Sequence, residues 1–241
     1  MSLGSLFSSI VKWALIGLAV LFCLPFAYLG TSYVYRLFHT YTHAYRLTVE
    51  VETPHGFVKG SSVIQVTFIP DMIDWNPSAA GLTIKAQGEA IFLDLGEGKN
   101  LVAVLGFGPT GANIDMVTHL AAYAFHRNKA FWYEQAPSWK GRAELYGGLL
   151  PTLVTFKDPS NPDTLQVVRS YELEKIFGPG YRFSNAWIDM THDRPTQHEI
   201  IKKLPWVGNY KEEKIAEHRM RAADYGLGSS GTPGMKFSRK R

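Results

Sequence analysis

The sequence predicts an α+β protein with a single N-terminal transmembrane helix followed by a mostly antiparallel β-sheet domain with packed helices. Three observations predict this fold. Residues 13–35 form a run that contains no charged residue. Further along the chain, short stretches of alternating apolar and polar residues are separated by turn residues, which is typical of β-hairpins. Between them, residues 114–126 carry apolar side chains at helical spacing.

The uncharged run is long enough to cross a membrane as a helix. A bilayer core about 30 Å thick needs roughly 20 mostly apolar residues. A cleaved secretory signal is the alternative, but the run is longer than a typical signal core. Its cleavage positions are also poor, because Pro25 lies two residues before Ala27 and Tyr28 two residues before Gly30. We therefore expect residues 1–38 to be a retained signal anchor that contacts membrane lipid.

Positive charges flank the run almost equally, so they give little information on orientation. Lys12 precedes the run, and Arg36 and Arg46 follow it. A short segment before a signal-like apolar core usually stays on the cytoplasmic side. The sequence therefore favours a single-pass protein with its N-terminus inside and its domain outside, which would be the periplasmic side of the inner membrane if the chain is bacterial, as the resemblance described below implies.

The length of 241 residues suits one anchor and one globular domain, which we place at residues 39–208. Alternation and turn residues predict strands at 47–52, 62–69, 89–95, 101–105, 151–157, 165–168 and 181–190. The strand at 101–105 is apolar on both faces, so we expect it in the middle of a sheet.

Helices are expected in three places within the domain. The helix at 114–126 has Asn113 as its cap, a second at 171–177 begins at Ser170, and a third runs from Pro195 to about Leu204. After the domain, residues 209–226 read as a heavily charged helix, and residues 227–241 as a disordered, basic, Gly/Ser-rich tail.

Two groups of ionisable residues are candidates for a catalytic site. Asp115, His119 and His126 share the polar face of the helix at 114–126 and could bind a metal or relay protons. A solvent-exposed polar face is the simpler interpretation, because convergent groups need a cleft. His192 and Asp193, with Asp189 and His198 nearby, could form an acid/base group, although a loop that starts the next helix is the simpler interpretation.

Metal and cofactor motifs are weak throughout the sequence. His39 and His43 are four residues apart and would share a face if the first helix continued, but zinc needs three or four ligands. The only cysteine, Cys23, lies in the apolar run. The glycines at 106–111 lack the Gly-Lys-Ser/Thr ending of a phosphate-binding loop. We therefore expect no metal and no cofactor.

Charge and aromatic content bear on possible partners. The net charge of +4 is small, and several of the basic residues lie at the C-terminus, so the sequence does not indicate nucleic-acid binding. Residues 129–146 are rich in Trp, Tyr and Phe. These side chains could form a contact surface for a protein partner in the membrane or envelope, or fill the core around an irregular segment.

One part of the chain has a recognisable pattern. Its motifs are 150–158 (LPTLVTFKD), Asn161-Pro162, Val167-Val168, 177–180 (FGPG) and 204–206 (LPW). Residues 145–207, which contain these motifs, resemble a group of short, often membrane-anchored, uncharacterised bacterial proteins. The resemblance implies membrane association and no catalytic residues.

Three functions agree with these observations. The sequence favours a membrane-anchored binding or accessory protein over an enzyme, because no motif defines a reaction. A membrane-tethered hydrolase and a structural envelope protein are the alternatives. A cleft that holds two of the five candidates would favour the hydrolase, whereas an aromatic pocket without convergent ionisable groups would favour binding. Those candidates are Asp115, His119, His126, His192 and Asp193.

Overall fold

The structure is a computed structural model that describes residues 3–70, 81–108, 111, 113–126, 132–207 and 238–239. Contacts between residues divide the chain into two compact units. The first consists of residues 1–40 and 69–83, and the second of residues 41–68 and 84–241. The long apolar N-terminal helix and two antiparallel sheets with short helices confirm the predicted α+β class.

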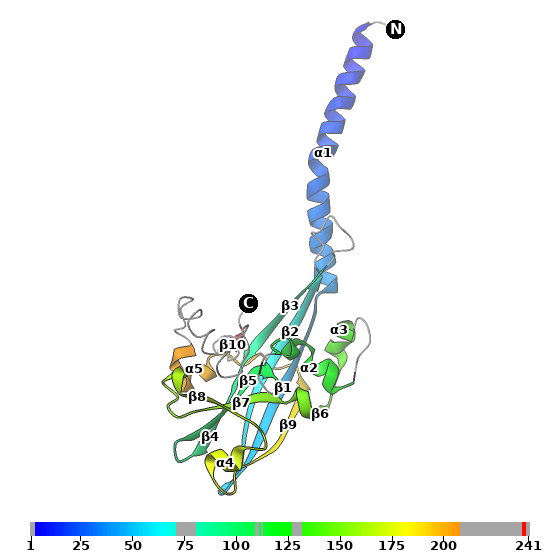
Figure 1. Cartoon of the computed structure of the whole chain (residues 1–241). Coiled ribbons are helices and arrows are strands. Elements are labelled where there is room, and N and C mark those ends of the chain that lie inside the picture. The colour runs from blue at the N-terminus through cyan, green and yellow to red at the C-terminus, as the bar shows by residue number, and fades with distance from the viewer. Residues whose placement is uncertain are drawn as a thin grey trace. The chain divides into compact units, whose positions relative to one another are not determined.

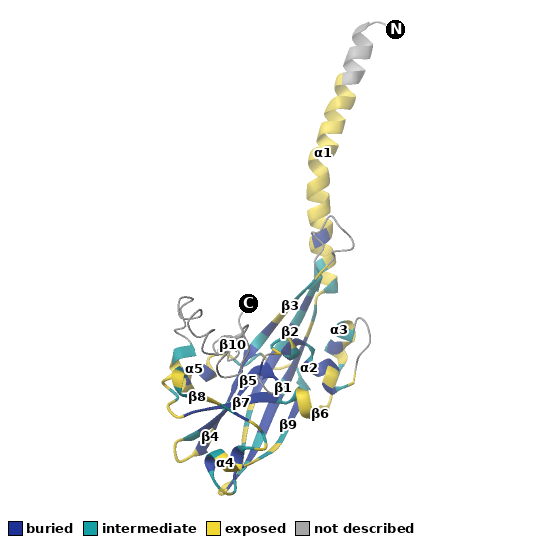
Figure 2. Cartoon of the chain, in the orientation of Figure 1, coloured by how far each residue is buried: buried dark blue, intermediate teal, exposed yellow. Residues whose placement is uncertain are grey.

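The first unit contains helix α1, Leu3–His39 (Figure 1). Within the described residues, one helix is long and apolar enough to cross a membrane, over Val11–His39. Figure 2 shows that almost all the residues of this helix whose burial is described are exposed. Near its end, Arg36 Nε donates a hydrogen bond to the carbonyl oxygen of Pro70, 3.2 Å away. The helix is therefore joined to the end of strand β2 within the same unit.

The first sheet has the strand order β10-β3-β2-β1-β9-β6. Its strands are β1 Tyr41–Thr53, β2 Gly56–Pro70, β3 Leu82–Glu89, β6 Arg142–Glu144, β9 Arg182–Thr191 and β10 Ser238–Arg239. Strand β1 pairs antiparallel with β2 and β9 over most of its length. The β1–β2 hairpin turns at Pro54 and His55, as the turn residues predict.

The second sheet has the order β4-β5-β7-β8, and its paired strands are antiparallel. Its strands are β4 Ile91–Gly96, β5 Lys99–Phe107, β7 Pro151–Phe156 and β8 Leu165–Val168. Strand β5 is buried from Asn100 to Phe107. It lies between β4 and β7, so the expected central position is confirmed.

Short helices connect and cover these sheets. They are α2 Met116–Ala124, α3 Trp132–Gln135, α4 Leu173–Phe177 and α5 Glu199–Lys203. Single 3-10 turns are η2 Ala136–Ser138, η3 Gly147–Leu149, η4 Pro162–Thr164 and η5 Pro205–Val207. The Asn113 side chain accepts a hydrogen bond from the Met116 amide, 3.1 Å away, so it caps α2 as predicted.

The two faces of β4 and β5 explain the layers of the second unit. A Cβ at Gly60 of β2 would lie 2.5 Å from Ile91 and 3.2 Å from Leu93, so β2 passes very close to β4. Alternate residues of a strand point to opposite faces. Phe92, between these two, packs instead with a cluster that includes Ile200 and Leu204. The second sheet is thus covered by the first sheet on one face and by α5 on the other.

Several expected local structures differ in the structure. The helix predicted from Pro195 is shorter and begins at Glu199. Neither Asp193 nor Thr196 caps it. Instead the Glu89 carboxylate accepts the backbone N–H groups of His198, Glu199 and Ile200 at the start of α5. Sequence spacing could not reveal this cap, because its acceptor lies about 110 residues away.

The start of α4 and the predicted C-terminal segments can be compared with the structure in part. Ser170 does not cap α4, because Glu172 is its N-cap residue. Residues 209–226, predicted as a charged helix, lie outside the described residues. The described part of the predicted tail is Ser238–Arg239, which forms β10 beside Gly88 and Glu89 of β3.

Candidate functional site

The three candidates near α2 do not converge. Asp115 lies just before the helix and is exposed, whereas His126 lies beyond its end and is also exposed. The nine residues of α2 lie between these two, and at a rise of 1.5 Å per residue they span about 13 Å. The Nδ1 atom of His119 lies 2.8 Å from Thr118 Oγ1 and 3.3 Å from the Asp115 carbonyl oxygen, so local groups occupy it.

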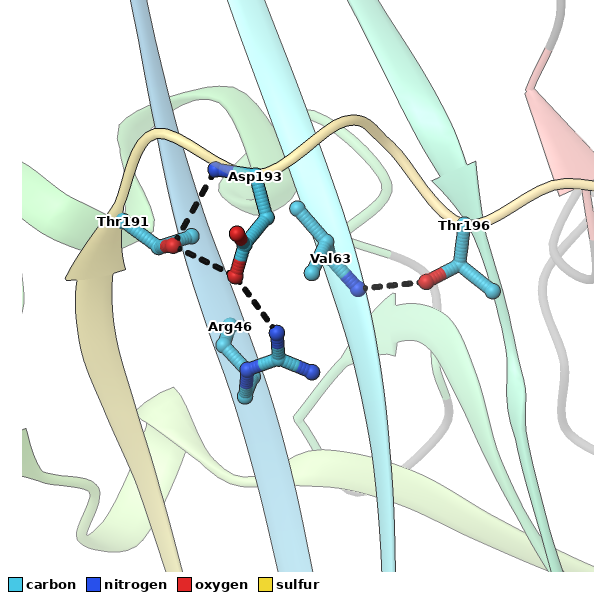
Figure 3. Close-up of polar contacts among 5 residues, drawn as sticks. All are labelled: Arg46, Val63, Thr191, Asp193 and Thr196. Atoms are coloured by element: carbon cyan, nitrogen blue, oxygen red, sulfur yellow. Dashed lines mark hydrogen bonds and ion pairs between the residues drawn. The ribbon is translucent and has the colours of Figure 1, made fainter.

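Asp193 lies in the loop that follows β9, and its carboxylate is already occupied (Figure 3). It accepts a hydrogen bond from Thr191 Oγ1 at 2.8 Å and an ion pair from Arg46 at 2.6 Å. These two contacts hold the pKa of Asp193 below its ordinary value. A carboxylate made less basic in this way is a poor general base near neutral pH.

Asp189 is likewise held by neighbouring side chains. Arg142 of β6 donates two hydrogen bonds to it, at 2.8 and 3.1 Å, and the Trp187 ring N–H donates a third at 2.9 Å. The Arg142 guanidinium also lies 4.8 Å from the centre of the Trp187 ring. This cluster joins β6 to β9, which explains Asp189 as a structural residue.

A small cavity of about 120 Å³ brings two of the candidates together. His192 and Asp193 line it, along with His43, Gln65 and Trp139. The helix α1 ends at His39, so His43 lies in β1 and does not share a helical face with His39. His43 is only 4% exposed, and within the described residues neither of its ring nitrogens has a hydrogen-bond partner. Burial lowers its pKa to about 4, so the ring is neutral at pH 7.

The aromatic rings of Trp132, Tyr133 and Trp139, which lie in the described part of this segment, pack against one another and against Phe68. Trp132 lies edge-on to Phe68, 5.2 Å between ring centres, and stacks with Trp139 at 5.8 Å. Tyr133 stacks on Phe68 at 5.2 Å. These three rings are half-buried, so each packs on its neighbours and also keeps exposed surface, whereas Tyr146 is 66% exposed.

A larger cleft of about 260 Å³ lies where the ends of several strands meet. Its apolar lining comes from Leu150, Pro151, Leu153, Val168 and Phe183. Its polar lining comes from Thr152, Arg169, Ser170 and Tyr171, and Gly108, Gly147 and Gly148 complete the wall. A mainly apolar cleft with a few polar groups is typical of a small-molecule site.

Sequence reasoning missed this cleft because its lining comes from four separated segments. The available signals were the Gly147-Gly148 pair and the Arg169-Ser170-Tyr171 stretch after β8. Neither has a spacing that would have marked a site. In the described part of the chain, no group of three or more His, Cys, Asp or Glu side chains is arranged to hold a metal.

Comparisons with known proteins add no relative. No protein-family model matches the sequence, and neither a curated protein nor a solved structure matches it. The class that the chain itself defines is an α+β protein with an N-terminal apolar helix long enough to span a membrane. Its globular unit contains a largely apolar cleft and a smaller polar cavity.

Proposed function

We propose that the chain is a single-pass membrane protein whose globular unit binds a small ligand as an accessory to another membrane component. The observation that carries the binding function is the cleft of about 260 Å³, lined on both sheets by apolar side chains. Such clefts bury the body of a small molecule while a few polar groups orient it.

The anchor is supported by the exposed apolar surface of α1. Large side chains such as Leu21, Phe22 and Phe26 are each more than 60% exposed. Exposed apolar surface of this extent marks a membrane or protein contact. Retention of the helix is supported by the length of the uncharged run and by its poor cleavage positions at Ala27 and Gly30.

We further propose the orientation in which the N-terminus stays in the cytoplasm and the domain lies in the periplasm of a bacterial cell. It rests on the short segment that precedes the apolar run. Extraction of membranes at alkaline pH, followed by protease treatment of spheroplasts, tests this part. The full-length chain should stay in the pellet, and its domain should be digested from outside. A domain protected in intact spheroplasts would contradict the orientation.

A hydrolase remains the second candidate, favoured by the cavity that His43, His192 and Asp193 line. Binding has better support because the carboxylate of Asp193 is held by Arg46 and that of Asp189 by Arg142. Incubation with a panel of activated esters tests the hydrolase. Turnover that His192→Ala abolishes, and Arg194→Gln leaves unchanged, would replace binding with catalysis as the function.

Binding itself can be tested by closing the cleft. Gly148 has an ordinary backbone conformation, and no atom lies within 4 Å of a Cβ built there, so a side chain can start at this position without a clash at its Cβ. The thermal stability of the detergent-solubilised full chain should rise when an organic extract of the source membranes is added. The increase should vanish in Gly148→Phe. An equal increase in both proteins would show that the cleft is not the site.

A further inference from the structure

The cleft lies where strands β5 and β7 separate. Ala103 is opposite Leu153, but four residues later Phe107 is opposite Pro151, only two residues earlier on β7. Strand β5 therefore carries two extra residues there, and the ladder is interrupted. Gly108 follows with φ of +80°, a conformation that favours glycine, and turns the chain away. The separation leaves a hollow between the ends of β7, β8 and β9.

Apolar side chains form the inner part of this hollow. Leu153 and Val168 are cross-strand partners in the second sheet and are 3% and 2% exposed. Phe183 reaches the cleft from β9 of the first sheet. The volume is slightly below the range of about 300–1,000 Å³ for drug-sized ligands. The ligand is therefore small, with an apolar body such as a short acyl chain.

The charge at the mouth comes from Arg169, which follows β8 directly. Of the described residues that line the cleft, it is the one with a charged side chain. Arg46, Arg142 and Arg182 each have a carboxylate within 4 Å, but within the described chain the Arg169 guanidinium has no such ion pair.

The nearest acidic residue in sequence does not neutralise this guanidinium. Glu172 accepts a hydrogen bond from the backbone N–H of Arg169, 3.3 Å away. Among the hydroxyls, Thr152 already donates to the Gly108 carbonyl oxygen at 2.5 Å. A planar guanidinium with free donors matches the geometry of a carboxylate or a phosphate.

We propose that the cleft binds a small amphipathic anion, with its apolar part against Leu153, Val168 and Phe183 and its carboxylate or phosphate on Arg169. This inference rests on the proposed function, since it names the ligand class of the same cleft. The apolar lining of the hollow supports binding of a small ligand, and the guanidinium of Arg169 supports a negatively charged one.

Three probes with one apolar body test the proposal: hexanoate, hexyl phosphate and hexanol. Their dissociation constants are measured by calorimetry on the full chain in a non-ionic detergent. At least one anion should bind about tenfold more tightly than hexanol, as one charge-assisted hydrogen bond allows. Preference for hexanoate would indicate a fatty-acid type of ligand, and preference for hexyl phosphate a lipid-phosphate type. Either preference supports the inference.

The variants separate charge from cavity. Arg169→Gln, at an exposed position, should weaken both anions to the level of hexanol without changing hexanol binding. Arg194→Gln removes an exposed arginine outside the cleft and should change nothing. Gly148→Phe should abolish binding of all three probes.

Two results would overturn the inference in different ways. Equal affinity for hexanol and the anions, or anion binding that Arg169→Gln leaves intact, would refute the anionic ligand while the cleft remained a binding site. No binding of any probe to the unmodified chain, or binding that Gly148→Phe leaves unchanged, would refute the cleft as a site and the proposed function with it.

Discussion

Replacement of His43 by phenylalanine should remove a large part of the acid sensitivity of the fold. The His43 ring packs against Phe68 and Trp132, with ring centres 5.9 Å away in both cases. It is 4% exposed, and its two ring nitrogens have no partner within the described residues. Burial disfavours the charged form, so the pKa falls from 6.5 to about 4.

The size and sign of the effect follow from this pKa. Between pH 6.5 and pH 4 the unfolded chain binds a proton that the folded chain excludes, so stability increases with pH. The contribution is fully present above pH 6.5 and is lost as the pH falls towards 4. A difference from 6.5 to 4 corresponds to about 3 kcal/mol, and most of it falls between pH 7.5 and pH 4.5.

The assay is urea denaturation of the detergent-solubilised full chain at pH 7.5 and pH 4.5. His43→Phe keeps the stacked ring and removes the titrating group. Between pH 7.5 and pH 4.5, its free energy of unfolding should fall by about 2 to 3 kcal/mol less than that of the unmodified chain. At pH 7.5 the variant should be at least as stable as the unmodified chain. Carboxylates that titrate in this range are common to both proteins and cancel.

His126→Asn is the matched control, because His126 is exposed and has φ of +54°, which asparagine tolerates. It should behave as the unmodified chain does at both pH values. Equal losses of stability in His43→Phe and the unmodified chain would refute the argument that a neutral, buried His43 is part of the fold.

Substitutions at three other positions test the contacts that hold the second unit together, each by urea denaturation. Glu89→Ala leaves the N–H groups of His198, Glu199 and Ile200 without their carboxylate and should lower the free energy of unfolding by about 3 kcal/mol or more. Glu89→Gln keeps one acceptor and should lower it by less. Equal stability of both variants and the unmodified chain would contradict the cap. Asn100→Ala removes two buried hydrogen bonds to the Phe156 backbone, at 2.7 and 2.9 Å, and should lower the free energy of unfolding by about 2 to 3 kcal/mol. A decrease of less than about 0.5 kcal/mol, as exposed substitutions usually give, would show that these two bonds contribute little to stability. Tyr45→Phe deletes the bond from its hydroxyl to the Val117 carbonyl oxygen and should cost about 1 kcal/mol, while no change would mean that β1 and α2 are joined by apolar packing alone.

The sequence predicted those parts of the fold that depend on local patterns. The alternation in β1, β2, β4 and β5 and the apolar stripe of α2 follow from burial on one face or on both, which the sequence shows directly. Strand β3 was missed although Leu82, Ile84 and Ala86 alternate with polar residues, because the run is short and ends at Gly88, a residue that weakens a strand pattern. A Cβ on Gly88 would lie 2.8 Å from Ile64 of the neighbouring strand β2. Glycine is therefore required there by contact with β2, which the pattern within β3 does not show.

The candidate sites depended on distant contacts and were harder to predict. His43 follows the first helix so closely that helical spacing with His39 suggested a shared face, although the chain changes to a strand at Tyr41. Asp193 has the residue type of a catalytic acid, yet it pairs with Arg46, 147 residues away. The cleft beside Arg169 joins segments from Gly108 to Phe183, and no local pattern brings these together.

Native mass spectrometry of the full chain, released from its membrane in a mild detergent, tests the central claim most directly. We expect a chain of 27.0 kDa that keeps its first 38 residues and carries one small bound molecule, with that molecule absent from Gly148→Phe. A chain that begins after residue 27 would contradict the anchor. A full-length chain with no bound molecule, or with the same molecule in both proteins, would contradict binding in the cleft.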